Sequence, residues 1–202
     1  MHRVSQIVAG WLVTVKAISE EDKDLYAYAV YSFLFGLIPI ALSLAFGIIS
    51  GMIAESFFLI VPFIIIRKFS GGFHFKSALL CFILTSCLLA SALAIVHLIA
   101  NTQQHILLSI AVMIATTVIF VFSPIDSEER ALNNSEIVQY RIIARIISVV
   151  FLIGYFLLVW ISNGRIFIPV GVGIVMVALL QIPCIILNAL SKRSLIKSVP
   201  KS

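Results

Sequence analysis

The chain has 202 residues, of which 61% are hydrophobic and 11% are charged, and its formal net charge is +5. Soluble domains are closer to half apolar and a quarter charged, so this composition excludes an ordinary globular protein. Apolar runs of about 20 residues recur along the sequence, and that is the length of a helix that crosses a bilayer. We therefore predict an all-α polytopic membrane protein. The modest charge excess does not indicate nucleic acid as a partner.

Residues 1–19 have the pattern of an amphipathic helix. Polar side chains fall on one side, and Trp11 belongs to the apolar side. We expect this helix to lie in the membrane interface, with a helix packed on the bundle as the alternative. An acidic hinge follows, and no removable signal peptide is expected. The apolar stripe consists of Val4, Ile7, Val8, Trp11, Leu12, Val15 and Ile18.

Six apolar spans then form one membrane domain across residues 25–190, followed by a basic tail at 191–202. The second and fourth spans are short for a full crossing. The second also carries Glu55 near its start, which favours a tilted, half-inserted or protein-shielded segment. The predicted spans are Leu25–Ile49, Gly51–Ile66, Ala78–Ala100, Ile106–Phe122, Ile142–Ile161 and Ile166–Leu190.

Basic residues gather in every second connection between these spans. Arg165 is the single basic residue in the remaining connections. Because basic loops stay in the cytoplasm, we predict that both termini and the 67–77 connection are cytoplasmic. The residues on that side are Arg3, Lys16, Lys23, Arg67, Lys68, Lys76, Arg130, Arg141, Arg145, Lys192, Arg193, Lys197 and Lys201.

The stretch from Arg67 to Cys81 reads RKFSGGFHFKSALLC, and three interpretations compete for its histidine and cysteine. Cys81 can be a packing residue, as we expect for Cys87 and Cys184 within their apolar runs. A metal site is disfavoured, because neither CxxC nor HxxxH spacing occurs and the stretch holds no carboxylate. The third interpretation is a cysteine nucleophile with His74 as its base.

Geometry restricts the third interpretation. In one straight helix His74 and Cys81 would be about 10 Å apart along the axis, too far for a hydrogen bond. The pair works only if the helix begins after His74. Gly71 and Gly72 permit such a turn, and Ser77 is a suitable N-cap that would place Cys81 in the first turns of the helix. Arg67 could add positive potential or bind a substrate carboxylate.

The pattern Arg67-x-x-x-Gly71-Gly72-x-His74-x₆-Cys81 between apolar spans resembles the accessory gene regulator B (AgrB) family. The resemblance extends over nearly the whole chain: its length, its amphipathic N-terminal segment, its six spans and the residues Ser123–Ser127 after the fourth span.

This resemblance implies a bacterial cell-membrane cysteine endopeptidase of quorum sensing. Its partner would be a small AgrD-like precursor peptide with an amphipathic leader, which it would cut and help to cyclise to a thiolactone or lactone signal. His74 and Cys81 would be the catalytic pair, and Arg67 and Gly72 would support substrate or loop shape. No cofactor is expected, and the sequence leaves open whether the protein forms a homodimer.

Two other classes remain open from the residues alone. A transporter would need ionisable groups deep in the membrane, and only Glu55 is a candidate. A non-catalytic scaffold would leave His74 and Cys81 with structural roles.

Overall fold

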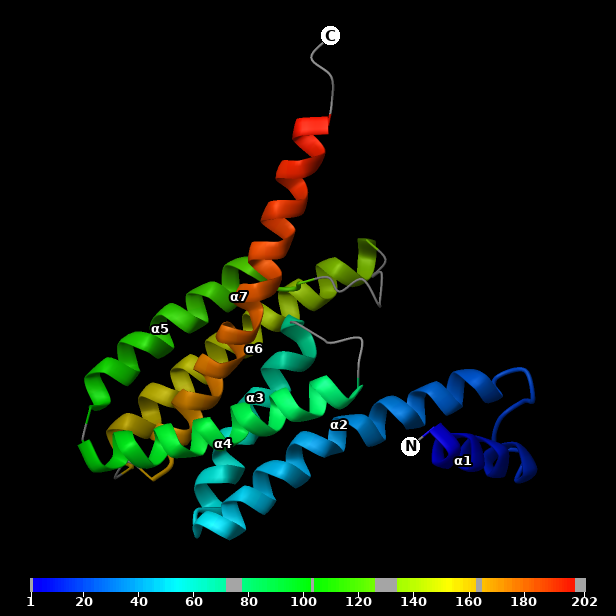
Figure 1. Ribbon diagram of the computed structural model, residues 1–202, viewed down its shortest axis with the longest axis horizontal. Coiled ribbons are helices and arrows are strands. Elements are labelled where there is room, and N and C mark those ends of the chain that lie inside the picture. The colour runs from blue at the N-terminus through cyan, green and yellow to red at the C-terminus, as the bar shows by residue number, and fades with distance from the viewer. Residues whose placement is uncertain (1, 72–77, 103, 126–133, 163–164, 199–202) are drawn as a thin grey trace. The chain divides into compact units, whose positions relative to one another are not determined.

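The computed structural model describes residues 2–71, 78–102, 104–125, 134–162 and 165–198 (Figure 1). Within these residues the chain is helical apart from short turns, which confirms the all-α prediction. The helices are α1 (His2–Thr14), α2 (Lys23–Ser50), α3 (Ile53–Ser70), α4 (Ala78–Thr102), α5 (His105–Phe122), α6 (Asn134–Ile161) and α7 (Phe167–Ser198).

The chain divides into two compact units, Met1–Leu42 and Ser43–Ser202, and each is described by itself. In the first unit the predicted apolar stripe of α1 is exposed: Ile7 is 70% and Trp11 61% accessible, while Ala9 on another face is buried. The helix ends earlier than the stripe. Lys16 takes a left-handed φ of 56°, and the Ala17 N–H donates to the Leu12 carbonyl, which is a Schellman ending.

In the second unit α7 is the central helix, in contact with α3, α4, α5 and α6. In its apolar stretch 56% of the residues are buried, whereas at most 28% are buried in any other candidate span. Glycine allows this close packing. A Cβ on Gly173 would collide with the Leu59 carbonyl oxygen of α3, and one on Gly171 would come within 2.7 Å of the Tyr155 ring of α6.

The helices around α7 expose apolar side chains on their outer faces. On α5, Leu108, Val112 and Ile119 are buried, but Ile106 and Ile114 are largely exposed. A soluble helix would carry polar residues on that outer face. An apolar outer face around an apolar core suits a lipid environment. A helix can span that environment because all its backbone hydrogen bonds are made within the segment.

Five helices are long and apolar enough to cross a membrane, in agreement with the predicted polytopic membrane protein. The stretches are Lys23–Ser50, Phe82–Thr102, His105–Phe122, Val138–Ile161 and Phe167–Leu187. The second predicted span is present as α3, but its eighteen residues include Glu55, Arg67 and Lys68. Six spans are therefore an approximate count, and whether α3 is tilted, half-inserted or shielded by protein stays a prediction.

Two helices extend beyond their predicted spans. α6 begins at Asn134 rather than near Ile142, and α7 continues to Ser198 rather than ending near Leu190. Hydropathy marks only the part of a helix that suits the bilayer. The polar turns that continue such a helix form the same backbone hydrogen bonds, so they are helical without being apolar.

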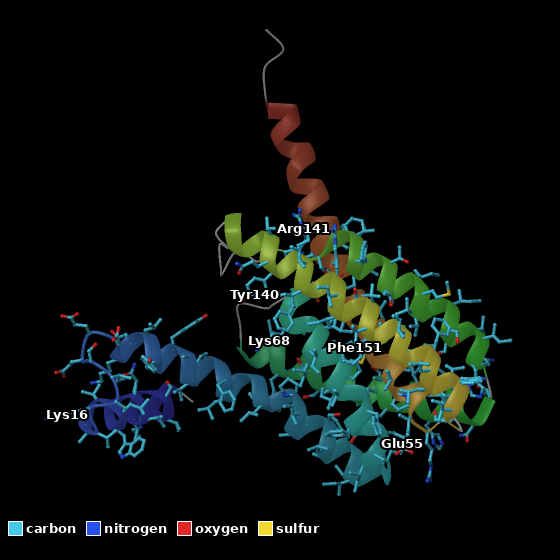
Figure 2. The ribbon with its side chains drawn as sticks, turned by 180° about the vertical axis from the view of Figure 1, so that it is seen from behind. Lys16, Glu55, Lys68, Tyr140, Arg141 and Phe151 are labelled. Carbon is cyan, nitrogen blue, oxygen red and sulfur yellow. The ribbon has the colours of Figure 1, made fainter. Side chains whose placement is uncertain are left out.

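The bundle of the second unit has two ends that differ in charge. At the first, which we call the Ser70 end, the Phe69 and Tyr140 rings are 6.1 Å apart. At the other, the Glu55 end, Arg165 Nε lies 3.8 Å from Glu55 Oε1. Figure 2 shows Lys68, Tyr140 and Arg141 toward one end and Glu55 at the other. Within this unit, Lys68 and Arg141 thus lie toward the Ser70 end, and Arg165 lies at the Glu55 end.

Candidate functional site

The stretch with the predicted catalytic residues begins where α3 ends. The Gly71 N–H closes the helix by donating to the Arg67 carbonyl at 3.2 Å. Gly71 then takes φ 72° and ψ −164°, a conformation that is essentially restricted to glycine. There it forms a parallel bridge with Ile125, whose carbonyl oxygen a Cβ on Gly71 would strike. Glycine at this position is required by both its backbone angles and its neighbour.

A buried hydrogen-bond network holds this turn, and we call it the Ser70 junction: Ser70, Gly71, Ser123, Ile125 and Gln181. The Ser70 carbonyl accepts from the Ile125 N–H at 3.0 Å and from Gln181 Nε2 at 3.3 Å. Gln181 Nε2 also lies 3.0 Å from Ser123 Oγ. Ser70 and Gln181 are completely buried. The junction therefore joins the end of α3, the residues after α5 and the middle of α7.

Arg67 lies one turn before the junction and is partly buried. Its guanidinium carbon is 5.6 Å from the centre of the Phe63 ring, a cation–π contact within α3. The predicted positive group thus stands at the Ser70 end, where the 72–77 connection begins.

The Ser70 end also contains the start of the long connection between α5 and α6. Arg145 of α6 donates from Nε to the Phe120 carbonyl at 3.2 Å, and its guanidinium carbon is 4.9 Å from the Phe120 ring centre. A cation at the last carbonyls of α5 stabilises that helix end. Residues 123–125 are thereby fixed between α5 and the junction.

Three of the predicted site residues, Gly72, His74 and Ser77, lie outside the described residues. Cys81 belongs to the first turn of α4, which begins at Ala78. The separation of His74 from Cys81 and the N-cap role of Ser77 stay predictions. Of the other two cysteines, Cys87 is exposed and Cys184 is half-buried, and both are free thiols. In the described parts of the chain no group of three or more His, Cys, Asp or Glu residues could hold a metal ion.

The sequence interpretation missed Gln181. Its signal was an amide within the apolar run VALLQIPC, where a polar side chain usually forms a hydrogen bond to another helix. The run itself does not reveal the partners, because Ser70 and Ser123 are far away in the sequence. Ile125 was noted only as part of the Ser123–Ser127 stretch, and its pairing with Gly71 was not anticipated.

The fold and the site together define a helical membrane protein. One end of its apolar bundle carries basic residues and a turn at a glycine, Gly71. Residues 5–186 match the family model described as Accessory gene regulator B. The chain belongs to this family, and it therefore has a role in the accessory gene regulator system at the membrane.

A curated relative is an AgrB-like protein of Clostridium perfringens (strain 13 / Type A). It is 21% identical over 141 residues, which cover 67% of this chain and 66% of the relative. The match thus spans slightly less than two thirds of that relative. No solved structure matches the chain.

Proposed function

We propose that the protein is a membrane cysteine endopeptidase that cuts the C-terminal part from a small AgrD-type precursor peptide and promotes cyclisation of the remainder. Family membership supports the precursor as its partner. The observation that carries the proposal is the Ser70 junction: it fixes the chain directly before the 72–77 connection, and Cys81 follows in the first turn of α4.

In the proposed reaction His74 takes the proton from Cys81, and the thiolate attacks a peptide carbonyl of the precursor. The C–N bond breaks, the leaving amine takes the proton from the histidine, and a thioester to Cys81 remains. Attack by an internal thiol or hydroxyl of the precursor then releases Cys81 and closes a thiolactone or lactone ring.

The first turn of α4 can assist this chemistry. The first four N–H groups of a helix have no partner within the helix, so they are available to an oxyanion. The positive end of the helix also favours a thiolate at Cys81 over the thiol. Arg67, at the end of α3, supplies further positive potential at the same end of the bundle.

The proposal includes an orientation. The Ser70 end, with Arg67, Lys68, Arg141 and Arg145, faces the cytoplasm with both termini, because basic segments are retained there. A cytoplasmic site would receive the precursor where it is made. The transporter alternative is weaker, because its candidate group, Glu55, is paired with Arg165 at the opposite end of the bundle.

The test measures cleavage of C-terminally tagged AgrD-type precursors in membranes that contain the full chain. Cys81→Ala and His74→Ala should each abolish release of the tag, and Cys81→Ala should also abolish the thioester adduct. Cys87→Ala is the matched control, because it removes an exposed thiol of the same helix. Cleavage by both the Cys81→Ala and the His74→Ala variants would disprove the proposal.

A further inference from the structure

The proposed chemistry assigns no role to Gln181, although this polar side chain of the Ser70 junction is completely buried. We propose that Gln181 is a positioning residue for the cleavage site. Its amide group fixes the Ser70 carbonyl and the Ser123 hydroxyl, and it thereby holds the point from which the connection to His74 starts. This inference rests on the proposed function and assigns to it a residue outside the Arg67–Cys81 stretch.

The orientation of the Gln181 amide follows from its partners. A carbonyl oxygen can only accept, so the atom 3.3 Å from the Ser70 oxygen must be the NH₂ nitrogen. The same nitrogen reaches Ser123 Oγ with its second hydrogen. Gln181 Oε1 then points elsewhere, and it is buried with no hydrogen-bond partner among the described residues. The side chain is thus used for its two donors alone.

Burying an amide in this way has a cost. A buried polar atom without a partner destabilises the fold, because it has lost its hydrogen bonds to water and gained none in the protein. Leucine or methionine would fill the space in α7 without that cost. In the structure this cost is offset by the hydrogen bonds of the amide to the Ser70 carbonyl and the Ser123 hydroxyl.

Fixing this carbonyl matters because the chain from it to His74 is short. Ser70 is completely buried, and Gly71 is held by both the Arg67 carbonyl and the Ile125 bridge. A shift at Ser70 would therefore move the start of a connection in which only three residues separate Ser70 from His74. Misplacement of a reacting group by about 1 Å can lower a rate on the order of 100-fold.

The test uses Gln181→Met, which keeps the length and volume of the side chain and removes both donors. The readout is the rate at which iodoacetamide alkylates Cys81 as a function of pH, measured on the Cys81 peptide in full-length protein in membranes. An unassisted thiol has a pKa of about 8.5, so roughly 3% of it is thiolate at pH 7. Loss of the His74 contact should therefore lower the alkylation rate near pH 7 roughly 10-fold.

The matched control is Ser43→Ala. Ser43 is also completely buried, and its hydroxyl donates to the Ser56 carbonyl of α3 at 3.1 Å, so this variant likewise removes a buried donor to an α3 carbonyl. That bond lies in the first half of α3, away from the junction. We expect Ser43→Ala to keep the wild-type pH profile and Gln181→Met to resemble His74→Ala. If Gln181→Met does not fold, Ser123→Ala is the milder variant: it removes the second acceptor that holds the Gln181 amide in place, and it should shift the profile in the same direction by a smaller amount.

Cleavage of the precursor provides the second readout. Gln181→Met should lower kcat at least 10-fold with little change in KM, because the precursor still binds but meets a misplaced base. If His74→Ala changes the Cys81 profile and the Gln181 and Ser123 variants do not, this inference is wrong and the proposed function stands. If His74→Ala itself leaves the profile unchanged, the proposed function fails and this inference with it.

Discussion

The two ends of the bundle are held together by different physical means. At the Glu55 end, Phe167 packs its ring against His105 and Tyr155, with centroids 5.2 and 6.1 Å apart. The ion pair beside them is open to solvent on one side, since the Arg165 side chain is 90% accessible. The Ser70 end also has a ring pair, Phe69 with Tyr140, but it adds buried hydrogen bonds among a carbonyl, a hydroxyl and an amide.

This difference shows where the molecule needs a defined geometry. Aromatic packing tolerates small shifts, and exposed ion pairs contribute little to stability. A buried network has one satisfied arrangement, and each lost partner is costly. The Ser70 end therefore holds its backbone in one place, as a reactive site requires, whereas the Glu55 end needs only to keep the helices together.

The largest expected effect concerns the side of the membrane on which each end lies. In a variant without native cysteines, Asn101→Cys near the Glu55 end should react with an impermeant thiol reagent added to intact cells. Ser127→Cys, in the connection between α5 and α6, should react only after the membrane is opened. The basic residues predict this difference, because they remain in the cytoplasm. The reverse pattern would place the Ser70 end outside the cell.

The next effect compares two glycines, one at each end. Gly51 and Gly71 have φ values of 70° and 72°, but a Cβ on Gly51 meets nothing within 4 Å, whereas one on Gly71 strikes the Ile125 carbonyl. Gly51→Ala should cost about 1 kcal/mol of unfolding free energy. Gly71→Ala should cost about 3 kcal/mol or more and abolish precursor cleavage, because it adds steric overlap in a glycine-only conformation. Unfolding in mixed micelles and the cleavage assay provide the measurements, and equal effects at the two glycines would remove the proposed contrast between the ends.

The same contrast explains what the sequence could predict. Hydropathy is a local property, and it located the helices that are apolar enough to cross a membrane. Glycine at position 71 was expected to permit a turn. Its close neighbour, Ile125, and the part that Gln181 plays could not be predicted, because both depend on pairing between residues distant in the sequence.

The smallest expected effect is that of the Glu55–Arg165 pair. Its atoms are 3.8 Å apart, and Glu55 is 16% accessible in its side chain. Removing the Glu55 charge has opposing consequences: the attraction to Arg165 is lost, but the half-buried carboxylate no longer has to be desolvated. The attraction itself is weak, because the Arg165 side chain is largely exposed. A double-mutant cycle of Glu55→Gln and Arg165→Gln should therefore give a coupling energy below about 1 kcal/mol. The coupling should fall further at 1 M salt, where the screening length is about 3 Å.

Both variants should cleave the precursor at the wild-type rate, because neither side chain reaches the Ser70 junction. A coupling of about 3 kcal/mol, or a loss of cleavage in Arg165→Gln, would show that the Glu55 end is as constrained as the Ser70 end.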